Sequence, residues 1–299
     1  MNGATQLELL IDAQNILGEN VLWCERSHRV FWTDIPAQRL HSYSPENGTS
    51  RVWSMPERLS CFAFTQDEHI LLIGLASRLA FFNLLTDTVS AICDVESDLA
   101  MTRVNDGRCD RQGGFVFGTM DERASKEAIG SFYRLHPDLT LERLPLPKIA
   151  IANSICFSPD GSAMLFCDSV EKIIYRWDGY ARGDTTPIRV FADLSPGSAA
   201  PDGAIIDADG FLWSAQWGGA RVVRYAPDGS VERMLQLSIS QPSCVCLGGA
   251  RLNQLFVTTA REALTLTQLA DQPLAGGLFH TRLDDVHGLP EARFNGLIS

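Results

Sequence analysis

The sequence predicts an all-β fold, a six-bladed β-propeller with four antiparallel strands in each blade. Three observations predict it: short β-rich segments recur along the chain, a turn precedes each of them, and their spacing is that of propeller blades. No apolar pattern with the spacing of an α-helix is sustained, and Gly and Pro recur too often for a helical fold. We expect residues 1–299 to form a single domain of this kind.

Six segments carry the repeat, and their first residues lie 40, 45, 49, 48 and 43 positions apart. The segments are Val30–Asp34, Ile70–Gly74, Phe115–Thr119, Met164–Asp168, Leu212–Gln216 and Leu255–Thr259. The turn before the fourth segment is Ser158-Pro-Asp-Gly161, in which Pro fixes φ and Gly accepts a positive φ. Each segment with its preceding strand therefore reads as a β-hairpin.

A further pair of short strands follows each segment, which brings the count to about four strands for each repeat. The turns Pro45-Glu-Asn-Gly48 and Pro227-Asp-Gly229 join two of these pairs and suit hairpins. Residues 7–11 form a spare strand, and we expect it to pair into the last blade and close the ring, which removes exposed sheet edges. After the late strand at residues 277–282 the sequence indicates a frayed end.

Composition and charge argue against several classes of partner. Of the 299 residues 45% are apolar, and the net charge of −11 disfavours nucleic acid and anionic membranes. No apolar run reaches the roughly 18 residues of a membrane helix, and no signal peptide is evident, so a cytoplasmic location is expected. The eight cysteines form no Cys-x-x-Cys motif, which favours reduced, buried thiols over a zinc site. Nothing in the sequence distinguishes a monomer from a homo-oligomer.

A polar residue recurs 10 to 12 positions before each marked segment, at the start of the preceding strand. In a propeller the innermost strand of each blade lines the central channel, so these side chains would converge on one mouth of that channel. We call them the ring residues: Glu19, Ser60, Asn105, Asn153, Asp202 and Ser243.

Oxygen ligands without imidazole suit a hard or borderline divalent cation such as Ca²⁺, Mg²⁺ or Mn²⁺, and argue against a standard catalytic zinc set. The alternative is that these side chains start strands and bind backbone groups. Arg103 lies two residues before Asn105 and on the same strand face, where it can hold a substrate oxygen near the ion. The alternative for Arg103 is a surface position in a loop.

The chain resembles the senescence-marker protein (regucalcin) and gluconolactonase family, and the matching motifs span nearly its whole length. They are Leu17-Gly-Glu19, Phe31-Trp-Thr-Asp-Ile-Pro-Ala37, Arg103-Val-Asn-Asp-Gly107, Gly118-Thr-Met120, Asn153 before Ser158-Pro-Asp-Gly161, Pro201-Asp-Gly203, Ile206-Asp-Ala-Asp-Gly-Phe-Leu-Trp213, Gly218-Gly-Ala-Arg-Val-Val-Arg224 and Ala275-Gly-Gly-Leu-Phe279. Ser-Pro-Asp-Gly alone is a weak signal, and the order and blade spacing of the motifs together make the set specific.

The resemblance implies a six-bladed propeller that hydrolyses a sugar lactone with one divalent metal ion, which could be Ca, Mg, Mn, Fe or Zn. It implies that Glu19, Asn153 and Asp202 bind the metal and that Arg103 and Asn105 contact the substrate. It further implies that Asp202 transfers the proton.

Two departures from the family pattern affect these expectations. Asn20-Val21 replaces the usual residues after the Gly-Glu pair, so the turn beside Glu19 changes. Glu122 matches the first of two family glutamates, whereas Arg123 stands where the second contacts sugar. We hypothesise that Arg123 favours a lactone bearing an anionic group through charge-assisted hydrogen bonds. The alternative is that Arg123 points into solvent.

The sequence therefore predicts a lactonase, with Asp202 as general base and acid and with Glu122 and Arg123 beside the substrate. A nucleophilic serine is not indicated, because no Gly-x-Ser-x-Gly elbow is present. The alternatives are a metal-dependent esterase or phosphotriesterase and a non-catalytic calcium-binding propeller. The sequence does not specify which lactone is the substrate or which metal is used.

Overall fold

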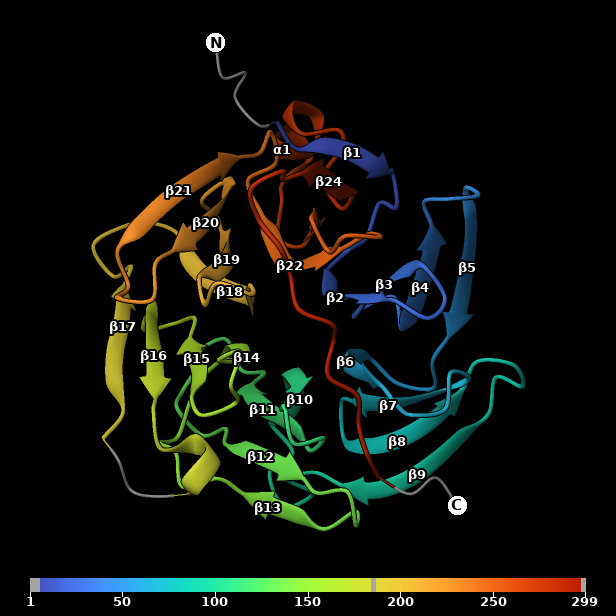
Figure 1. The fold of residues 1–299 in the computed structure, drawn as a ribbon, viewed down its shortest axis with the longest axis vertical. Coiled ribbons are helices and arrows are strands. Elements are labelled where there is room, and N and C mark those ends of the chain that lie inside the picture. Colours follow the sequence, from blue (N-terminus) through green and yellow to red (C-terminus); the bar gives the residue numbers. More distant parts are fainter. Residues whose placement is uncertain (1–5, 184–186, 297–299) are drawn as a thin grey trace.

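The structure is a computed structural model that describes residues 6–183 and 187–296, and it is a six-bladed β-propeller (Figure 1). Each blade is a four-stranded antiparallel sheet, as predicted. From the innermost strand outward, blades 1 to 3 are β2 (Gly18–Cys24), β3 (Arg29–Asp34), β4 (Arg39–Ser44), β5 (Thr49–Ser54); β6 (Leu59–Phe64), β7 (Ile70–Leu75), β8 (Arg78–Asn83), β9 (Val89–Asp94); and β10 (Thr102–Cys109), β11 (Phe115–Asp121), β12 (Phe132–Leu135), β13 (Leu141–Arg143). Blades 4 to 6 are β14 (Ala152–Phe157), β15 (Met164–Asp168), β16 (Ile173–Trp177), β17 (Arg189–Asp193); β18 (Ala200–Ile206), β19 (Leu212–Trp217), β20 (Arg221–Tyr225), β21 (Val231–Gln236); and β22 (Pro242–Gly248), β23 (Gln254–Thr259), β24 (Leu278–Arg282), β1 (Glu8–Ile11).

The N-terminal strand closes the ring. β1 pairs antiparallel with β24, with Glu8 opposite His280, so the first strand of the chain becomes the outermost strand of the last blade. The prediction for residues 7–11 is confirmed. Blade 6 is thereby built from both ends of the propeller sequence, and the chain passes from its outermost strand into blade 1.

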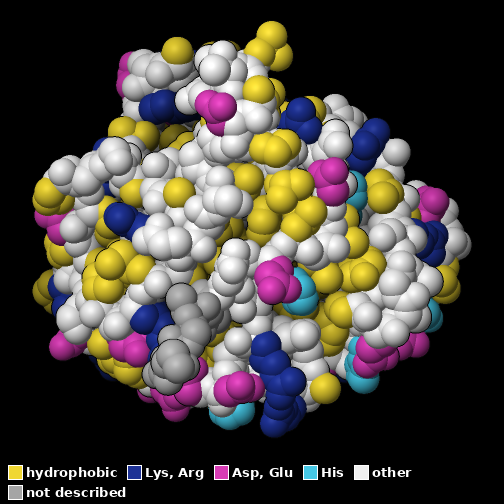
Figure 2. All heavy atoms as spheres, turned by 90° about the horizontal axis from the view of Figure 1, so that it is seen from above, with side chains coloured by type: hydrophobic (Ala, Val, Ile, Leu, Met, Phe, Trp, Pro, Cys, Tyr) yellow, Lys and Arg dark blue, Asp and Glu magenta, His cyan; other side chains and the backbone are white. Residues whose placement is uncertain are grey.

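Helices are minor elements of this fold. The 3₁₀-helix η1 (Tyr180–Arg182) lies in blade 4, and α1 (Leu266–Asp271) lies between β23 and β24. α1 begins with a capping box, in which Thr265 and Gln268 each bind the other's backbone N–H. Within the described ranges, no helix is long and apolar enough to cross a membrane. Acidic and basic side chains are interspersed over the face of the molecule seen in Figure 2.

The core lies between neighbouring blades. Phe31 of blade 1 packs edge-on against Phe64 of blade 2, with ring centroids 5.5 Å apart. Phe132 of blade 3 packs in the same way on Phe166 of blade 4, at 4.9 Å. Each sheet therefore buries both of its faces against a neighbour, which fixes the position of every innermost strand around the axis.

The C-terminal segment, residues 283–296, is ordered, so the expectation of a frayed end is wrong. It crosses the ring near the axis (Figure 1) and bonds in turn to blades 6, 5, 1, 2 and 3. Phe294 is fully buried, and its N–H donates to the Phe64 carbonyl at 2.8 Å. The apolar burial of Leu283, Val286 and Phe294, together with these hydrogen bonds, offsets the conformational entropy lost on ordering the segment. Composition alone did not predict these contacts.

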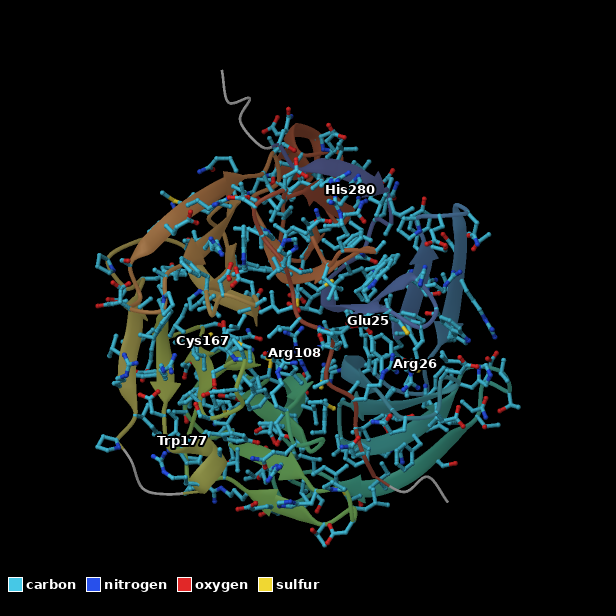
Figure 3. All side chains as sticks on the ribbon, viewed as in Figure 1. Glu25, Arg26, Arg108, Cys167, Trp177 and His280 are labelled. Carbon is cyan, nitrogen blue, oxygen red and sulfur yellow. The ribbon has the colours of Figure 1, made fainter. Side chains whose placement is uncertain are left out.

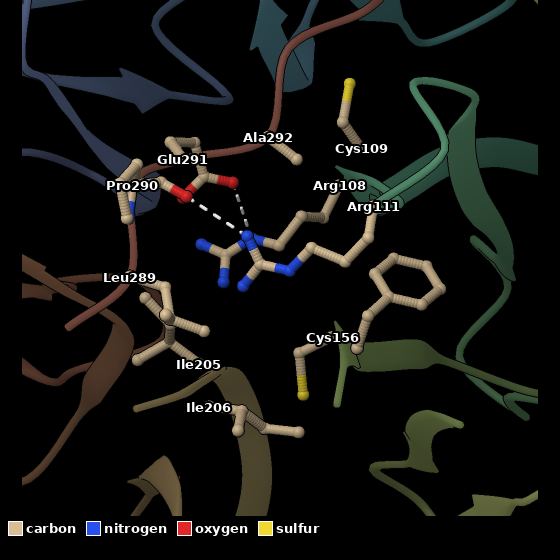
Figure 4. A pocket seen from close by; sticks show the side chains of 11 residues that line it. Arg108, Cys109, Arg111, Cys156, Ile205, Ile206, Leu289, Pro290, Glu291 and Ala292 are labelled. Atoms are coloured by element: carbon tan, nitrogen blue, oxygen red, sulfur yellow. Dashed lines mark hydrogen bonds and ion pairs between the residues drawn. The ribbon is translucent and has the colours of Figure 1, made fainter. Parts of the chain in front are cut away.

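This segment closes one mouth of the channel, because its partners follow the C-terminal ends of the innermost strands. Glu291 forms an ion pair with Arg108 at 3.3 Å, and the Pro290 carbonyl accepts a hydrogen bond from Arg111 (Figure 4). Arg108 lies near the axis of the ring (Figure 3). The ring residues start the innermost strands, so their mouth is the opposite one.

His41 provides a test of the packing in blade 1. Its ring stacks on Trp32 at 5.0 Å, and its Nε2 has no hydrogen-bond partner within the described residues. Burial lowers the pKa of His41 from 6.5 to about 4. Between these values the unfolded chain binds more protons than the folded chain, so the folded state loses stability as the pH falls from 6.5 to 4.

His41→Phe keeps the stacked ring and removes the titration. We expect the free energy of unfolding of the native protein to fall by up to about 3 kcal/mol more than that of the variant over this window. Urea unfolding at pH 7.5 and pH 4 measures the difference. Equal pH dependence of the two proteins would show that folding does not lower the pKa of His41.

Candidate functional site

A β-bulge interrupts all six innermost strands at the level of the ring residues. The pairing register shifts between Glu19 and Leu22, and an equivalent shift occurs at or next to each of the other five ring positions. A bulge bends a strand and re-aims its side chains. The six bulges lie at one end of the channel, so they form the mouth opposite the C-terminal segment.

In blades 1 and 4, the last residue of the second strand is an aspartate that fixes the segment leading into the innermost strand. Asp34 accepts hydrogen bonds from the N–H groups of Ile16 and Leu17, just before Glu19. Asp168 accepts from Ala150 and Ile151 in the same way, just before Asn153. The residues that follow, Asn20 and Ser154, have φ of 43° and 57°. The left-handed backbone and the anchored entry together turn Glu19 and Asn153 toward the axis.

A cavity of about 300 Å³ occupies this mouth, a size that suits a monosaccharide-sized ligand. Five residues singled out from the sequence line it together: Glu19, Arg103, Asn105, Asn153 and Asp202. Its remaining lining combines apolar and polar side chains from all blades except blade 2: Leu17, Ile35, Met120, Lys126, Ile151, Ser169, Ala200, Trp217 and Glu262.

Glu19 and Asp202 place two carboxylates in the cavity without a cationic partner. Among the described residues neither forms an ion pair, and Asp202 is only 6% exposed. Burial and the nearby charge of Asp106 raise the pKa of Glu19 to about 8. Burial, Glu19 and Asp106 raise the pKa of Asp202 well above its usual range. Two acids in such surroundings repel each other, and a cation between them would remove the repulsion.

The side chains present fit a divalent cation. The carboxylates of Glu19 and Asp202 and the amide oxygen of Asn153 line one cavity, and oxygen ligands suit hard cations. The Asn153 amide is oriented by two partners: Asn105 Nδ2 donates to its Oδ1 at 3.1 Å, and its Nδ2 donates to Ser169 Oγ at 2.9 Å. Its oxygen therefore faces the same space as the carboxylates and keeps a lone pair for a ligand.

Arg103 is held by its own blade and by blade 2. It is 8% exposed, and its Nη1 donates to Asn105 Oδ1 at 2.7 Å, to Ser60 Oγ at 3.1 Å and to the Val104 carbonyl. Its Nη2 has no protein acceptor within the described residues. A buried guanidinium with a donor left over toward a cavity can bind a substrate oxygen.

The two ring serines do not line the cavity. Ser60 is 1% exposed and serves Arg103, while the Ser243 hydroxyl donates to the Gly18 carbonyl beside Glu19. Ser243 therefore fits the alternative that a ring residue starts a strand and binds a backbone group. The other four ring residues face the cavity.

Glu122 and Arg123 also lie outside the cavity lining. Arg58 forms a bidentate ion pair with Glu122, in which Arg58 Nη2 donates to Glu122 Oε2 at 2.9 Å. Glu122 Oε1 lies 3.6 Å from Arg103 Nε. Arg123 bonds to Asp121 at 2.9 Å and to Glu127 at 3.1 Å, and its side chain is 35% exposed. These contacts occupy much of its guanidinium, and its role in substrate choice stays a prediction.

Sequence reasoning missed four polar or aromatic residues of the cavity. Ser169 directly follows β15, Trp217 ends β19, and Glu262 lies just beyond β23. Lys126 lies in the loop after β11, four residues beyond Glu122. Their common signal is position, because the second strand of each blade ends at the same mouth at which the innermost strand begins.

Comparison with known proteins gives a consistent result. The family described as SMP-30/Gluconolactonase/LRE-like region matches residues 17–261. The chain is 49% identical to L-arabinolactonase of Azospirillum brasilense, over 98% of this chain and 97% of that protein. It is 30% identical to 6-deoxy-6-sulfogluconolactonase of Pseudomonas putida, over 97% and 99% of the two chains.

A solved structure shares this architecture. The calcium-binding protein regucalcin of Agrobacterium tumefaciens superposes with a TM-score of 0.91 at 29% sequence identity. The match covers 97% of this chain and 98% of that one.

Proposed function

The chain belongs to the SMP-30/gluconolactonase/LRE-like family and is an enzyme of the lactonase type, and we propose that it opens a sugar lactone with the help of one divalent metal ion. One observation carries the metal part of the proposal. Glu19 and Asp202 face one small cavity without a cationic partner in the described chain, beside the oriented amide of Asn153. The calcium-binding description of the regucalcin relative supports it.

Glu19, Asn153 and Asp202 would hold the ion. When bound there, a divalent ion supplies Lewis-acid polarisation of the lactone carbonyl. The residues accept Ca²⁺, Mg²⁺, Mn²⁺, Fe²⁺ or Zn²⁺ by ligand type, and we propose no choice among them.

Asp202 is the proton carrier in this proposal. Its carboxylate accepts a proton from the attacking water as the oxygen of that water bonds to the carbonyl carbon. The same carboxyl then returns the proton to the ring oxygen as the ring C–O bond breaks. One water is consumed, and the product is the open hydroxy acid.

Arg103 and Asn105 position the lactone. The unpartnered Nη2 of Arg103 can donate to a substrate oxygen, and Asn105 ties Arg103 to Asn153 through two hydrogen bonds. These two hydrogen bonds hold the Arg103 guanidinium at a fixed place relative to Asn153, which favours a reactive orientation of the substrate.

A sugar lactone is the proposed substrate class, with a pentonolactone of the L-arabino configuration as the first choice. The name of the relative that is 49% identical supports this choice. The experiment that tests it measures the hydrolysis of a panel of aldonolactones through the acid that is released. Metal-stripped and metal-reloaded protein are compared. We expect the pentonolactones to show the highest kcat/KM. A larger or aromatic ester as the best substrate would contradict the proposal.

A further inference from the structure

Two charged side chains of the cavity lining are not used by the proposed mechanism. Lys126 belongs to blade 3 and Glu262 to blade 6, which lie on opposite sides of the ring (Figure 1). In the described part of the chain neither takes part in an ion pair, whereas Arg103 faces Glu122 and Glu122 is bound by Arg58.

The loop that carries Lys126 is folded around Asp121, whose side chain is fully buried. Asp121 accepts hydrogen bonds from the N–H groups of Arg123, at 3.0 Å, and Glu127, at 2.7 Å. The Asp121 carbonyl accepts from Lys126 Nζ at 2.9 Å. The ammonium is therefore held at the cavity by one backbone acceptor, and two of its three donors remain for a ligand.

Glu262 is fixed through its backbone. Its N–H donates to the Ile16 carbonyl at 2.9 Å, and its own carbonyl accepts from Gln241 Nε2 at 2.9 Å. The carboxylate has no donor among the described residues. Glu262 lines the cavity together with Glu19 and Asp202.

A sugar lactone carries hydroxyl groups that both donate and accept hydrogen bonds, and an ammonium and a carboxylate on opposite sides complement such a ring. We propose that Lys126 and Glu262 determine substrate specificity by binding the hydroxyl groups of a neutral sugar lactone from opposite sides, and that Glu262 disfavours lactones bearing an anionic group. This inference rests on the proposed function. It assigns the choice between neutral and anionic lactones to these two residues, whereas the sequence assigned it to Arg123.

The test uses Lys126→Gln and Glu262→Gln, which remove the charges and keep most of the side-chain volume. The probes are a neutral pentonolactone and a lactone bearing a carboxylate. We expect each variant to lower kcat/KM for the neutral lactone roughly tenfold, mainly through KM, since one charge-assisted hydrogen bond is lost. The kcat should stay within about threefold, because neither side chain serves the proton transfer.

The ratio of kcat/KM for the anionic lactone to that for the neutral one supplies the distinguishing signature. Glu262→Gln removes a repulsion and is expected to raise this ratio roughly tenfold. Lys126→Gln removes an attraction and is expected to lower it. Ratios that stay constant, or that move in the same direction in both variants, would overturn the proposal. So would a ratio that falls in Arg123→Gln and stays unchanged in Lys126→Gln.

Lys126 and Lys172 both have a positive φ, 48° and 60°, and both ammonium groups donate to a backbone carbonyl. Lys172 lies outside the cavity, so Lys172→Gln is the matched control. We expect it to behave as the native protein.

A binding measurement separates this inference from the proposed function. The probe is a 1,4-anhydropentitol, a sugar ring without the lactone carbonyl, titrated by calorimetry. Weaker binding of the probe to both variants than to the native protein supports the inference. It does so even if the native protein opens no lactone, a result that would refute only the proposed function. Equal binding to all three proteins would overturn the inference even if lactones are hydrolysed.

Discussion

Replacing Asp202 with asparagine is expected to lower kcat for lactone opening by roughly three orders of magnitude. The amide has the shape of the carboxylate, but it cannot accept a proton from water at neutral pH. Asp202 is 6% exposed and lies at the mouth of the channel, so solvent cannot readily replace it as proton acceptor. The substitution also removes one negative charge from the proposed cation site, which should weaken metal binding.

Steady-state rates at saturating metal and lactone measure this effect, and calorimetric titration of the metal separates lost affinity from lost proton transfer. Asp209→Asn is the matched control, since Asp209 belongs to the same blade and its side chain is 66% exposed. We expect that control to keep its activity. A folded Asp202→Asn protein that retains a tenth or more of the native rate would exclude Asp202 as the proton carrier.

Replacing Arg103 with lysine is expected to lower kcat/KM roughly a hundredfold. Lysine keeps the positive charge, but its single ammonium cannot bond to Asn105 and Ser60 and also donate to the substrate as the planar guanidinium can. Loss of the Arg103–Asn105 bond also releases Asn105, which donates to Asn153 at 3.1 Å. We expect KM to rise and kcat to fall together.

Arg143→Lys provides the comparison, because Arg143 lies on the exposed outer strand β13 of the same blade. Circular dichroism and the unfolding midpoint show whether Arg103→Lys folds normally. Native values of both KM and kcat in a folded Arg103→Lys protein would mean that Arg103 does not contact the substrate.

Much of the fold follows from local chemistry. Turns such as Ser158-Pro-Asp-Gly161 and alternating apolar runs specify hairpins, and a regular spacing of hairpins specifies blades. The closing strand was also predictable, because residues 7–11 have β-propensity and no partner near them in sequence. The C-terminal segment was not, because Phe294 is buried by contacts with blade 2 that no local pattern encodes.

The candidate site shows the same division. Counting back from each second strand found Glu19, Asn153 and Asp202, because equivalent positions of equivalent strands meet at one mouth. It did not distinguish these from Ser243, whose hydroxyl turns to a backbone carbonyl. That difference depends on the backbone geometry of each bulge, which sets the direction in which the ring side chain points. Lys126 lies on a loop whose shape is set by the buried Asp121 carboxylate, so the spacing of residues could not predict its position.

We infer that the chain opens a sugar lactone with a metal held by Glu19, Asn153 and Asp202. The most direct measurement is the initial rate for the best lactone of the panel, first with chelator-stripped protein and then after adding Ca²⁺, Mg²⁺, Mn²⁺, Fe²⁺ or Zn²⁺ separately. We expect the stripped protein to fall to the spontaneous rate, and at least one ion to restore turnover in the native protein but not in Asp202→Asn. Full activity of the stripped protein would contradict the role of the metal. Spontaneous rates with every ion and every lactone would contradict the lactonase itself.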